Sequence, residues 1–268
     1  MSTRWNVHRL PRAEGKTFLV TGANAGIGYH VAEQLATTGA TVVLGSRSKT
    51  KADEAMASIR SVVPGARVRH LQLDLADLDS LKATANELDS LDAVVCNAGV
   101  QIDDADLMYT TNHLGHFVLV HWLMPLLEQA QEGRVVTTGS LVGKDEPPKD
   151  AYARSKQAQM LFGFEFARRQ SEVLSVVNHP GGALDSLTPP RKLLSLPAGL
   201  LLQGKDAGAW PAVRAVLDPE VRGGQMWGPR VFGLRGEPRV EPVRGLLADR
   251  ALAARVWADS VERTGVEP

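Results

Sequence analysis

Two residues in the segment 151–156 have the types and the spacing for acid–base chemistry. Tyr152 and Lys156 lie four positions apart in a stretch whose pattern predicts a helix, so both side chains should share one face. A phenol ordinarily loses its proton near pH ~10, and a neighbouring cation favours the phenolate. Lys156 can therefore bring Tyr152 toward a pKa that suits proton transfer. The other tyrosines, Tyr29 and Tyr109, have no lysine four positions on.

Composition limits what the chain can bind. Its 268 residues carry 30 basic and 30 acidic side chains, which gives no overall field to attract nucleic acid or an anionic membrane. No run approaches the ~20 apolar residues of a membrane helix, and nothing at the N-terminus resembles a secretory signal. The single cysteine, Cys96, cannot form an internal disulfide and is expected to be a buried residue at a strand end. We therefore expect a cytoplasmic protein.

Short apolar runs alternate with stretches of helical spacing along most of the chain. We expect strands at 17–20, 41–44, 68–73, 91–96, 133–138, 174–178 and, at a sheet edge, 225–227. Helices are expected at 27–38, 79–88, 114–129, 151–170, 207–217 and 247–262. This alternation predicts a single-domain α/β fold with a doubly wound, mostly parallel sheet of about seven strands and helices on both faces. Residues 1–15 are expected to form an N-terminal arm, residues 16–268 the domain, and residues 182–209 a substrate-binding loop or lid.

A glycine-rich turn lies between the first expected strand and the first expected helix. Residues 21–28 are Thr-Gly-Ala-Asn-Ala-Gly-Ile-Gly. Glycines at this point let the backbone turn sharply and approach a diphosphate, while the helix N-terminus offers free amides and partial positive charge. Three glycines in this place favour dinucleotide binding over a merely tight connection. Their spacing differs from GxGxxG, since three residues separate the first two glycines.

The order of motifs along nearly the whole chain resembles that of the short-chain dehydrogenases and reductases. The motifs after the glycines are Asp74-Leu75, Asn97-Ala98-Gly99, Thr111-Asn112-His113-Leu114-Gly115-His116, Ser140, Tyr152 with Lys156, and His179-Pro180-Gly181. The region from Gly223 to Pro229 and the helix around Trp257 are most similar to the retinol-dehydrogenase-like and protochlorophyllide-reductase-like branch. The resemblance implies a Rossmann fold and an oxidoreductase.

The resemblance also implies roles for particular residues. The implied catalytic tetrad is Asn112, Ser140, Tyr152 and Lys156. The implied cofactor-binding residues are Gly22, Asn24, Ala25, Gly26, Ile27, Gly28, Ser46, Arg47, Asp74, Leu75, Asn97, Ala98, Gly99, Tyr152, Lys156, Pro180, Gly181 and Ala183. Hydride would pass between nicotinamide and a carbonyl carbon while Tyr152 exchanges a proton with the oxygen. Ser140 would bind the same oxygen, Lys156 would lower the tyrosine pKa and hold the ribose, and Asn112 would hold a relay water.

The end of the second expected strand distinguishes between the two nicotinamide cofactors. An NAD-binding protein needs a carboxylate there for the ribose 2′-hydroxyl, whereas a 2′-phosphate needs a cation. This chain has Ser46 and Arg47 with Lys49 and Lys51 nearby, and no acid. We therefore expect NADP(H) rather than NAD(H). If Arg47 only caps a solvated strand end, both cofactors would bind.

Three departures from the family pattern limit what can be carried over. Only fifteen positions separate Asn97 from Asn112, so the intervening helix must be short and a homodimer, a homotetramer or a monomer is possible. Asp185, with Ser186 beside it, stands where a threonine is usual, so we expect the carboxylate to turn outward. Gly139 replaces a common serine before Ser140, which should do little harm.

The substrate is predicted only by class. Leucines at positions 193, 194, 196, 200, 201 and 202 suggest a lipophilic carbonyl or alcohol, although they could equally pack a helix on the body or contact a membrane surface. We expect no metal, because His113 and His116 lack a third ligand and favour a packing role. The alternative functions are a non-catalytic NADP-binding redox sensor, which would not need Tyr152 and Lys156, and a sugar-nucleotide epimerase or dehydratase, which normally has different glycine spacing.

Overall fold

The parallel sheet predicted from the sequence forms the centre of the molecule. The computed structural model describes residues 5–144, 146–182 and 203–268. In these residues one eight-stranded sheet has the order β3-β2-β1-β4-β5-β6-β7-β8, with only β8 antiparallel to its neighbour. Its strands are β1 (Thr17–Thr21), β2 (Thr41–Ser46), β3 (Arg67–Gln72), β4 (Ala93–Cys96), β5 (Arg134–Thr138), β6 (Leu174–Asn178), β7 (Met226–Val231) and β8 (Arg235–Glu241).

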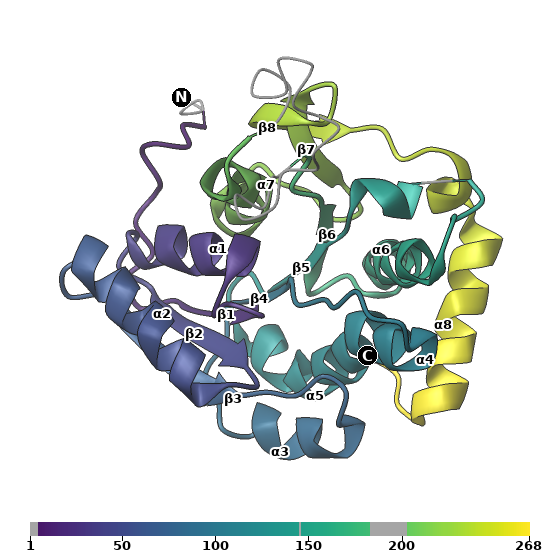
Figure 1. Ribbon diagram of the computed structural model, residues 1–268, viewed down its shortest axis with the longest axis horizontal. Helices are drawn as coiled ribbons and strands as arrows, with labels where there is room; N and C mark the ends of the chain where they lie inside the picture. Colours follow the sequence, from purple (N-terminus) through teal and green to yellow (C-terminus); the bar gives the residue numbers. More distant parts are fainter. Residues whose placement is uncertain (1–4, 145, 183–202) are drawn as a thin grey trace.

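Helices cover both faces of the sheet (Figure 1). One face carries α1 (Gly26–Ala36), α2 (Lys49–Val62) and α7 (Lys205–Leu217). The other carries α3 (Leu81–Ala85), α4 (Ala105–Tyr109), α5 (Gly115–Gln129), α6 (Ala151–Arg169) and α8 (Arg250–Thr264). The described residues also contain short helical turns. Three are 3-10 helices, namely η1 (Leu78–Ser80), η3 (Leu141–Lys144) and η5 (Gly245–Ala248). The fourth, η2 (Thr110–Leu114), is a π-helical turn that joins α4 to α5.

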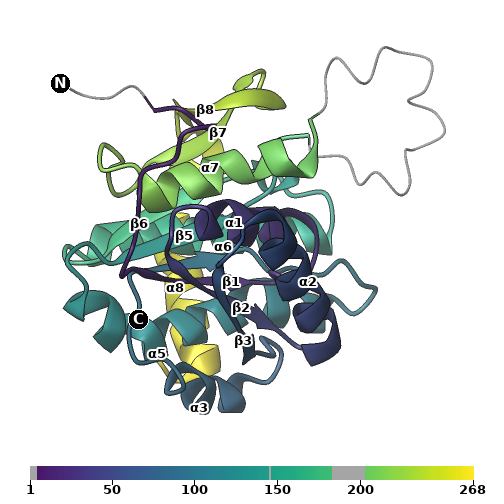
Figure 2. The same ribbon diagram turned by 90° about the vertical axis from the view of Figure 1, so that its left-hand side faces the viewer.

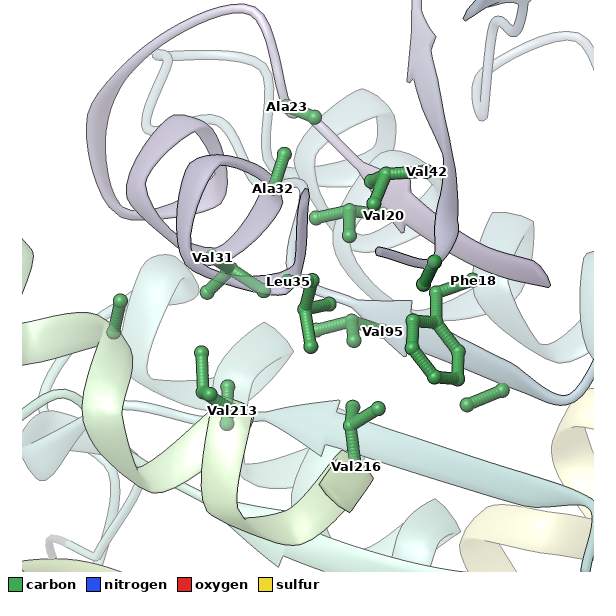
Figure 3. Close-up of a cluster of buried hydrophobic side chains, with 14 of the residues drawn as sticks. Phe18, Val20, Ala23, Val31, Ala32, Leu35, Val42, Val95, Val213 and Val216 are labelled. Carbon is green, nitrogen blue, oxygen red and sulfur yellow. The ribbon is translucent and has the colours of Figure 1, made fainter. Parts of the chain in front are cut away.

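Alternation along the strands divides the core between the two faces. Phe18 and Val20 of β1 point toward α1 and α7, where they join Leu35 and Val213 in one buried cluster (Figure 3). Leu19, between them in sequence, belongs to the cluster on the opposite face. Most of the apolar surface that stabilises the fold is buried in these two layers.

Aromatic rings form the centre of the second layer. Phe117 of α5, Phe162 and Phe166 of α6 and Trp257 of α8 lie against one another, with centroids 5.2 Å apart for Phe117 and Trp257 and 6.0 Å apart for Phe162 and Trp257. These separations are those of favourable aromatic pairs. The C-terminal helix is therefore anchored on α6, the helix that carries Tyr152 and Lys156.

The described part of the N-terminal arm packs on α7 (Figure 2). The Arg214 guanidinium lies 5.5 Å from the ring centroid of Trp5, and His8 meets Trp210 edge to face at 5.7 Å. The arm is thus held by ring contacts from the first described residue onward.

The connection from β6 to α7 is held at both ends by the β7–β8 hairpin. Gly182 N donates to Leu234 O at 2.9 Å, and Gly236 N donates to Gln203 Oε1 at 2.9 Å. Gln203 N also donates to Gly182 O at 3.3 Å. Residues 183–202 between these ends include Ala183, Asp185, Ser186 and the six leucines, and they lie outside the described residues.

The structure corrects several expectations. There are eight strands rather than about seven, and residues 225–227 do not form an edge strand, because β7 lies between β6 and β8. Helix α2 was not predicted, and the expected helix at 79–88 is only η1 followed by α3. The short helix expected between Asn97 and Asn112 is confirmed as α4, and Cys96 is buried at the end of β4 as predicted.

Candidate active site

A cleft of about 460 Å³ opens at the carboxyl ends of β1, β2 and β4. This is where open α/β sheets bind ligands, since the strand order reverses there. Twelve predicted cofactor residues line it: Gly22, Asn24, Ala25, Gly26, Ile27, Ser46, Arg47, Asp74, Leu75, Asn97, Ala98 and Gly99. The remaining lining residues are Gly45, Leu73, Val100, Thr111 and Lys205, which sequence reasoning missed.

The glycine loop has the geometry that a diphosphate requires. Gly22 and Gly26 have φ values of +67° and +62°, which L side chains adopt at a cost. A Cβ on Gly28 would lie 2.5 Å from Gly22 O and would also collide with Asn97 Nδ2. The N-terminus of α1 has no side-chain cap and no acidic residue in its first turn, so its amides remain available to an anion. The loop therefore fits the diphosphate of a dinucleotide.

The residues at the end of β2 form the second part of the cleft. Arg47 is exposed and makes no ion pair with any residue that the structure describes, while Lys49 pairs with Asp53 at 2.8 Å. Ser46 is buried, and its hydroxyl lies 3.3 Å from His70 Nε2. Arg47 thus has its guanidinium available for an anion at the cleft.

Ser140 and Tyr152 are brought together by the turn after β5 and the first turn of α6. Burial raises the pKa of the Tyr152 phenol, a hydrogen bond with Ser140 lowers it, and Asp150 raises it. The net pKa is above the ordinary value. A tyrosine that keeps its proton is suited to donate it to a carbonyl oxygen that Ser140 also binds.

Lys156 lies four positions after Tyr152 on α6, as its spacing predicts, but its ammonium bonds to other groups. Its Nζ donates to Thr138 O at 2.8 Å and to Gln159 Oε1 at 2.5 Å. Burial lowers the pKa of Lys156 to about 8. The expectation that Lys156 lowers the pKa of Tyr152 does not hold in this structure, since the ammonium contacts these acceptors instead.

The Lys156 ammonium nevertheless lies close to the nucleotide cleft, on the inner side of its wall. A Cβ on Gly99 would lie 3.7 Å from Lys156 Nζ and 3.3 Å from Asn112 Oδ1. Gly99 lines the cleft, so the lysine lies directly behind its wall. Gln159, which sequence reasoning missed, continues the network by donating to Cys96 O at 3.0 Å. No motif marked it, because a glutamine inside a helix is usually a solvated residue.

Asn112 lies in the π-helical turn η2, a type of distortion frequent at functional sites. Its Oδ1 accepts from Val100 N at 2.7 Å, and its Nδ2 donates to Val100 O and to Ser155 Oγ, both at 2.9 Å. The side chain therefore ties the loop after β4 to α6. Its expected role in a water relay remains a prediction.

His113 and His116 are buried, and each forms a hydrogen bond with a hydroxyl group. His113 Nε2 lies 2.8 Å from Ser260 Oγ, and His116 Nε2 lies 2.9 Å from Thr21 Oγ1. Burial is the main cause that lowers the pKa of each to about 3. Both are thus neutral rings at physiological pH.

Three other predicted residues lie away from the cleft wall or outside the described chain. Pro180 and Gly181 follow β6, next to the β7–β8 hairpin, while Ala183 lies outside the described residues.

Gly139 packs closely on α6, because a Cβ there would lie 2.6 Å from Met160 Sδ. The missing serine before Ser140 therefore has a packing explanation.

Comparisons with known proteins agree with this geometry. The family model of short chain dehydrogenases matches residues 16–182. Mouse polyprenol dehydrogenase is 33% identical over 96% of this chain and 86% of its own, and mouse retinol dehydrogenase 14 is 30% identical over 94% and 86%. A crystal structure of an uncharacterized protein from Mycobacterium paratuberculosis superposes with a TM-score of 0.78 at 29% identity, covering 99% of both chains.

The fold, the cleft and these matches define an oxidoreductase with a nicotinamide-binding Rossmann fold. The chain belongs to the short-chain dehydrogenase/reductase family, in its retinol-dehydrogenase-like subgroup. Among the described residues, no helix is both long enough and apolar enough to cross a membrane.

Proposed function

We propose that the protein transfers hydride between NADP(H) and a lipophilic ketone or aldehyde, or the corresponding alcohol. The observation that carries this proposal is the nucleotide cleft with Lys156 directly behind its wall at Gly99, on the helix that also carries Tyr152. In the proposed reaction one carbonyl oxygen contacts the hydroxyl groups of Tyr152 and Ser140, which interact with each other. Lys156, behind the wall of the nucleotide cleft, completes the acid–base set.

Each residue of the set has a distinct task. Tyr152 donates its proton to the carbonyl oxygen during reduction and accepts it back during oxidation. Ser140 donates a hydrogen bond to the same oxygen and stabilises the charge that develops there. Lys156 provides positive charge behind Gly99 of the cleft, and Asn112 connects α6 to the loop after β4. Bound cofactor supplies or accepts the hydride.

The residues that hold the cofactor follow from the cleft. The uncapped first turn of α1 binds the diphosphate, and Arg47 binds the 2′-phosphate of NADP(H). Lys205, at the first turn of α7, adds a second cation to the same cleft. All of Asp74, Asn97, Ala98 and Gly99 line the cleft, and we infer that Asp74 lies beside the adenine and the other three beside the ribose. Pro180 and Gly181 lie on the nicotinamide side.

The preference for a lipophilic substrate is supported by two relatives, whose names are polyprenol dehydrogenase and retinol dehydrogenase 14. Polyprenols and retinol are long apolar alcohols. The leucines of residues 193–202, in the segment proposed as the substrate loop, agree with this class. The cytoplasmic location, the homo-oligomer and the division into arm and domain stay predictions.

The test is oxidation of NADPH with a panel of apolar ketones and aldehydes, and reduction of NADP with the matching alcohols. Tyr152→Phe should retain cofactor binding and lose turnover by about 10²–10⁴-fold. Equal turnover by the variant would remove Tyr152 from the mechanism. Binding of NADPH without turnover of any substrate by the parent would instead indicate a non-catalytic sensor.

A further inference from the structure

A buried charged cluster lies beside the candidate active site and is not used by the proposed chemistry. It consists of Lys144, His179 and Glu241, which come from three distant parts of the chain. Lys144 ends η3, the turn that directly follows Ser140, and His179 directly follows β6 and precedes Pro180. Glu241 is the last residue of β8. The cluster therefore joins both active-site loops to the C-terminal hairpin.

One carboxylate oxygen forms the centre of the cluster. Glu241 Oε2 lies 2.6 Å from Lys144 Nζ and 3.1 Å from His179 Nε2. The exposed fractions of the side chains are 9% for Glu241, 0% for His179 and 27% for Lys144. Breaking a pair this deeply buried leaves an uncompensated charge, which is strongly unfavourable.

The hydrogen bonds define which ring nitrogen of His179 carries the proton. Gly181 N donates to His179 Nδ1 at 3.2 Å, and a backbone N–H can only donate. Nδ1 is therefore the acceptor, and the proton of the neutral ring sits on Nε2, from where it donates to Glu241. Lys144 Nζ and His179 Nε2 are 2.9 Å apart, but both are donors, so each bonds to the carboxylate between them.

The two charged residues act in opposite directions on the ring. Burial and the Lys144 ammonium lower the pKa of His179, whereas Glu241 raises it, and the net result is a lowered pKa. Lys144 and Glu241 are the charged groups that face His179 among the described residues. A proton added to Nδ1 would confront the Gly181 N–H and break that bond. The lysine thus protects the turn that contains Gly181 against acid.

Glycines in the hairpin make room for the carboxylate. A Cβ on Gly228 would lie 2.6 Å from Glu241 Oε1 and would overlap His179 Nε2, and a Cβ on Gly233 would lie 3.2 Å from Oε1. The opposite wall comes from the turn itself, since Gly181 has a φ of +74° and a Cβ there would lie 2.6 Å from Leu234 O. The hairpin is therefore fitted closely to both partners.

We propose that Glu241 and Lys144 are positioning residues, which hold His179 as a neutral Nε2–H ring and so fix the Pro180–Gly181 turn relative to Ser140. The inference rests on the proposed function, in which this turn borders the nicotinamide and Ser140 binds the carbonyl oxygen. In this proposal Glu241 and Lys144 contact His179 and do not take part in the chemistry. Their effect on the reaction is transmitted through the two loops.

The first experiment measures the ring directly in protein without added cofactor. With ¹⁵N-labelled histidine and His179→Asn to assign the signal, followed from about pH 5 to 8, His179 should be a neutral ring protonated on Nε2 at the alkaline end and should titrate at lower pH than an ordinary histidine. In Lys144→Met the ring should titrate at higher pH than in the parent, because one of the groups that lower its pKa is gone. Lys144→Arg should restore the parent behaviour.

The second experiment measures NADPH affinity across the same range. Lys144→Met should bind NADPH about fivefold more weakly at the acid end, in step with protonation of His179, and like the parent at the alkaline end. Glu241→Gln should show no such acid limb, since the group that raises the His179 pKa is removed, but should lower kcat with little change in KM.

These outcomes separate the inference from the proposed function. A proton on Nδ1 in the parent, or identical titration in the parent and Lys144→Met, would overturn the inference whatever the enzyme does. Should Lys144→Met fail to fold, the parent spectrum alone decides the tautomer. The predicted ring state in a protein that turns over no substrate would contradict only the proposed function.

Discussion

Lys156 Nζ donates to Gln159 Oε1 at 2.5 Å, and Gln159 lies three residues further along α6. The ammonium is held between this amide and Thr138 O, which lies at 2.8 Å. Because burial lowers the pKa of Lys156 to about 8, the charged form depends on these two acceptors. Among the described side chains, Gln159 is therefore the one placed to change the pKa of Lys156.

Gln159→Leu should shift the alkaline limb of kcat/KM to lower pH. The lost oxygen stabilised the ammonium, so the pKa of Lys156 falls further when the acceptor is removed. Activity above pH ~8 should drop by about tenfold relative to the parent, with smaller losses near neutrality. Gln159→Glu should move the limb in the opposite direction. A limb that stays in place in both variants would contradict this role.

Arg47→Ala should weaken NADPH binding by about 10- to 100-fold and change NADH binding by less than about threefold. The reason is that only NADPH offers a phosphate to the guanidinium. The matched control is Lys49→Ala, because Lys49 is already paired with Asp53 at 2.8 Å. Fluorescence titration with both cofactors measures the effect. Equal losses for the two cofactors would remove Arg47 from 2′-phosphate recognition.

Gly28→Ala should lower both stability and cofactor affinity. The new methyl group would lie 2.5 Å from Gly22 O, which forces the glycine loop and α1 apart at a cost of about 1–3 kcal/mol. Gly223→Ala is the control, since the nearest atom to its Cβ would be Ser175 O at 3.9 Å. Urea unfolding and NADPH titration of both variants test this difference.

Phe232→Asn should stabilise the protein by about 0.5–1 kcal/mol. Phe232 has a φ of +52° and is 84% exposed, so it carries backbone strain without compensating burial. Asparagine tolerates this conformation better. Val240→Asn, in the strand of the same hairpin, should give no gain. A loss of stability in Phe232→Asn would show that the ring makes contacts that offset the strain.

Protein stability should fall as the pH drops from about 6.5 toward 3, in part because of His113. Burial lowers the pKa of His113 to about 3, so in this window the unfolded chain binds a proton that the folded chain excludes. His113→Phe should reduce the acid dependence of stability, because phenylalanine takes up no proton when the chain unfolds. Ser260 Oγ keeps a partner in this variant, since it donates to Val256 O at 2.7 Å. The measurement is the urea midpoint as a function of pH, and an unchanged slope would argue against His113.

Local pattern predicted the part of the site where neighbours in sequence act together. The glycine loop connects two consecutive elements, and Tyr152 and Lys156 lie on one helix, so spacing predicted the place of both motifs along the chain. Helix α2 was not predicted, because its buried face has too few large apolar residues to show a clear helical periodicity. The buried residues of this face are Ala52, Ala55, Met56 and Ile59. Strand β8 was not predicted, because its sequence RGEPRVE is mostly polar and contains a proline.

Contacts between distant elements could not be predicted in this way. Lys205 lines the cleft only because α7 packs on α1, where Gln34 Nε2 donates to Asp206 O at 2.8 Å. The direction of the Lys156 ammonium depends on the carbonyl of Thr138, which belongs to β5. Such relationships are set by tertiary packing, and no spacing within one element encodes them.

The bonds that link Gly182, Gln203 and the β7–β8 hairpin have a consequence for how such chains diverge. The backbone departs at Gly182 and returns at Gln203, which donates to it directly. We therefore expect that a change in the number of residues between these two positions leaves Gly182 and Gln203 in place on the hairpin. If this segment is the substrate loop proposed above, its exchange between relatives would alter substrate preference and leave the nucleotide cleft as it is.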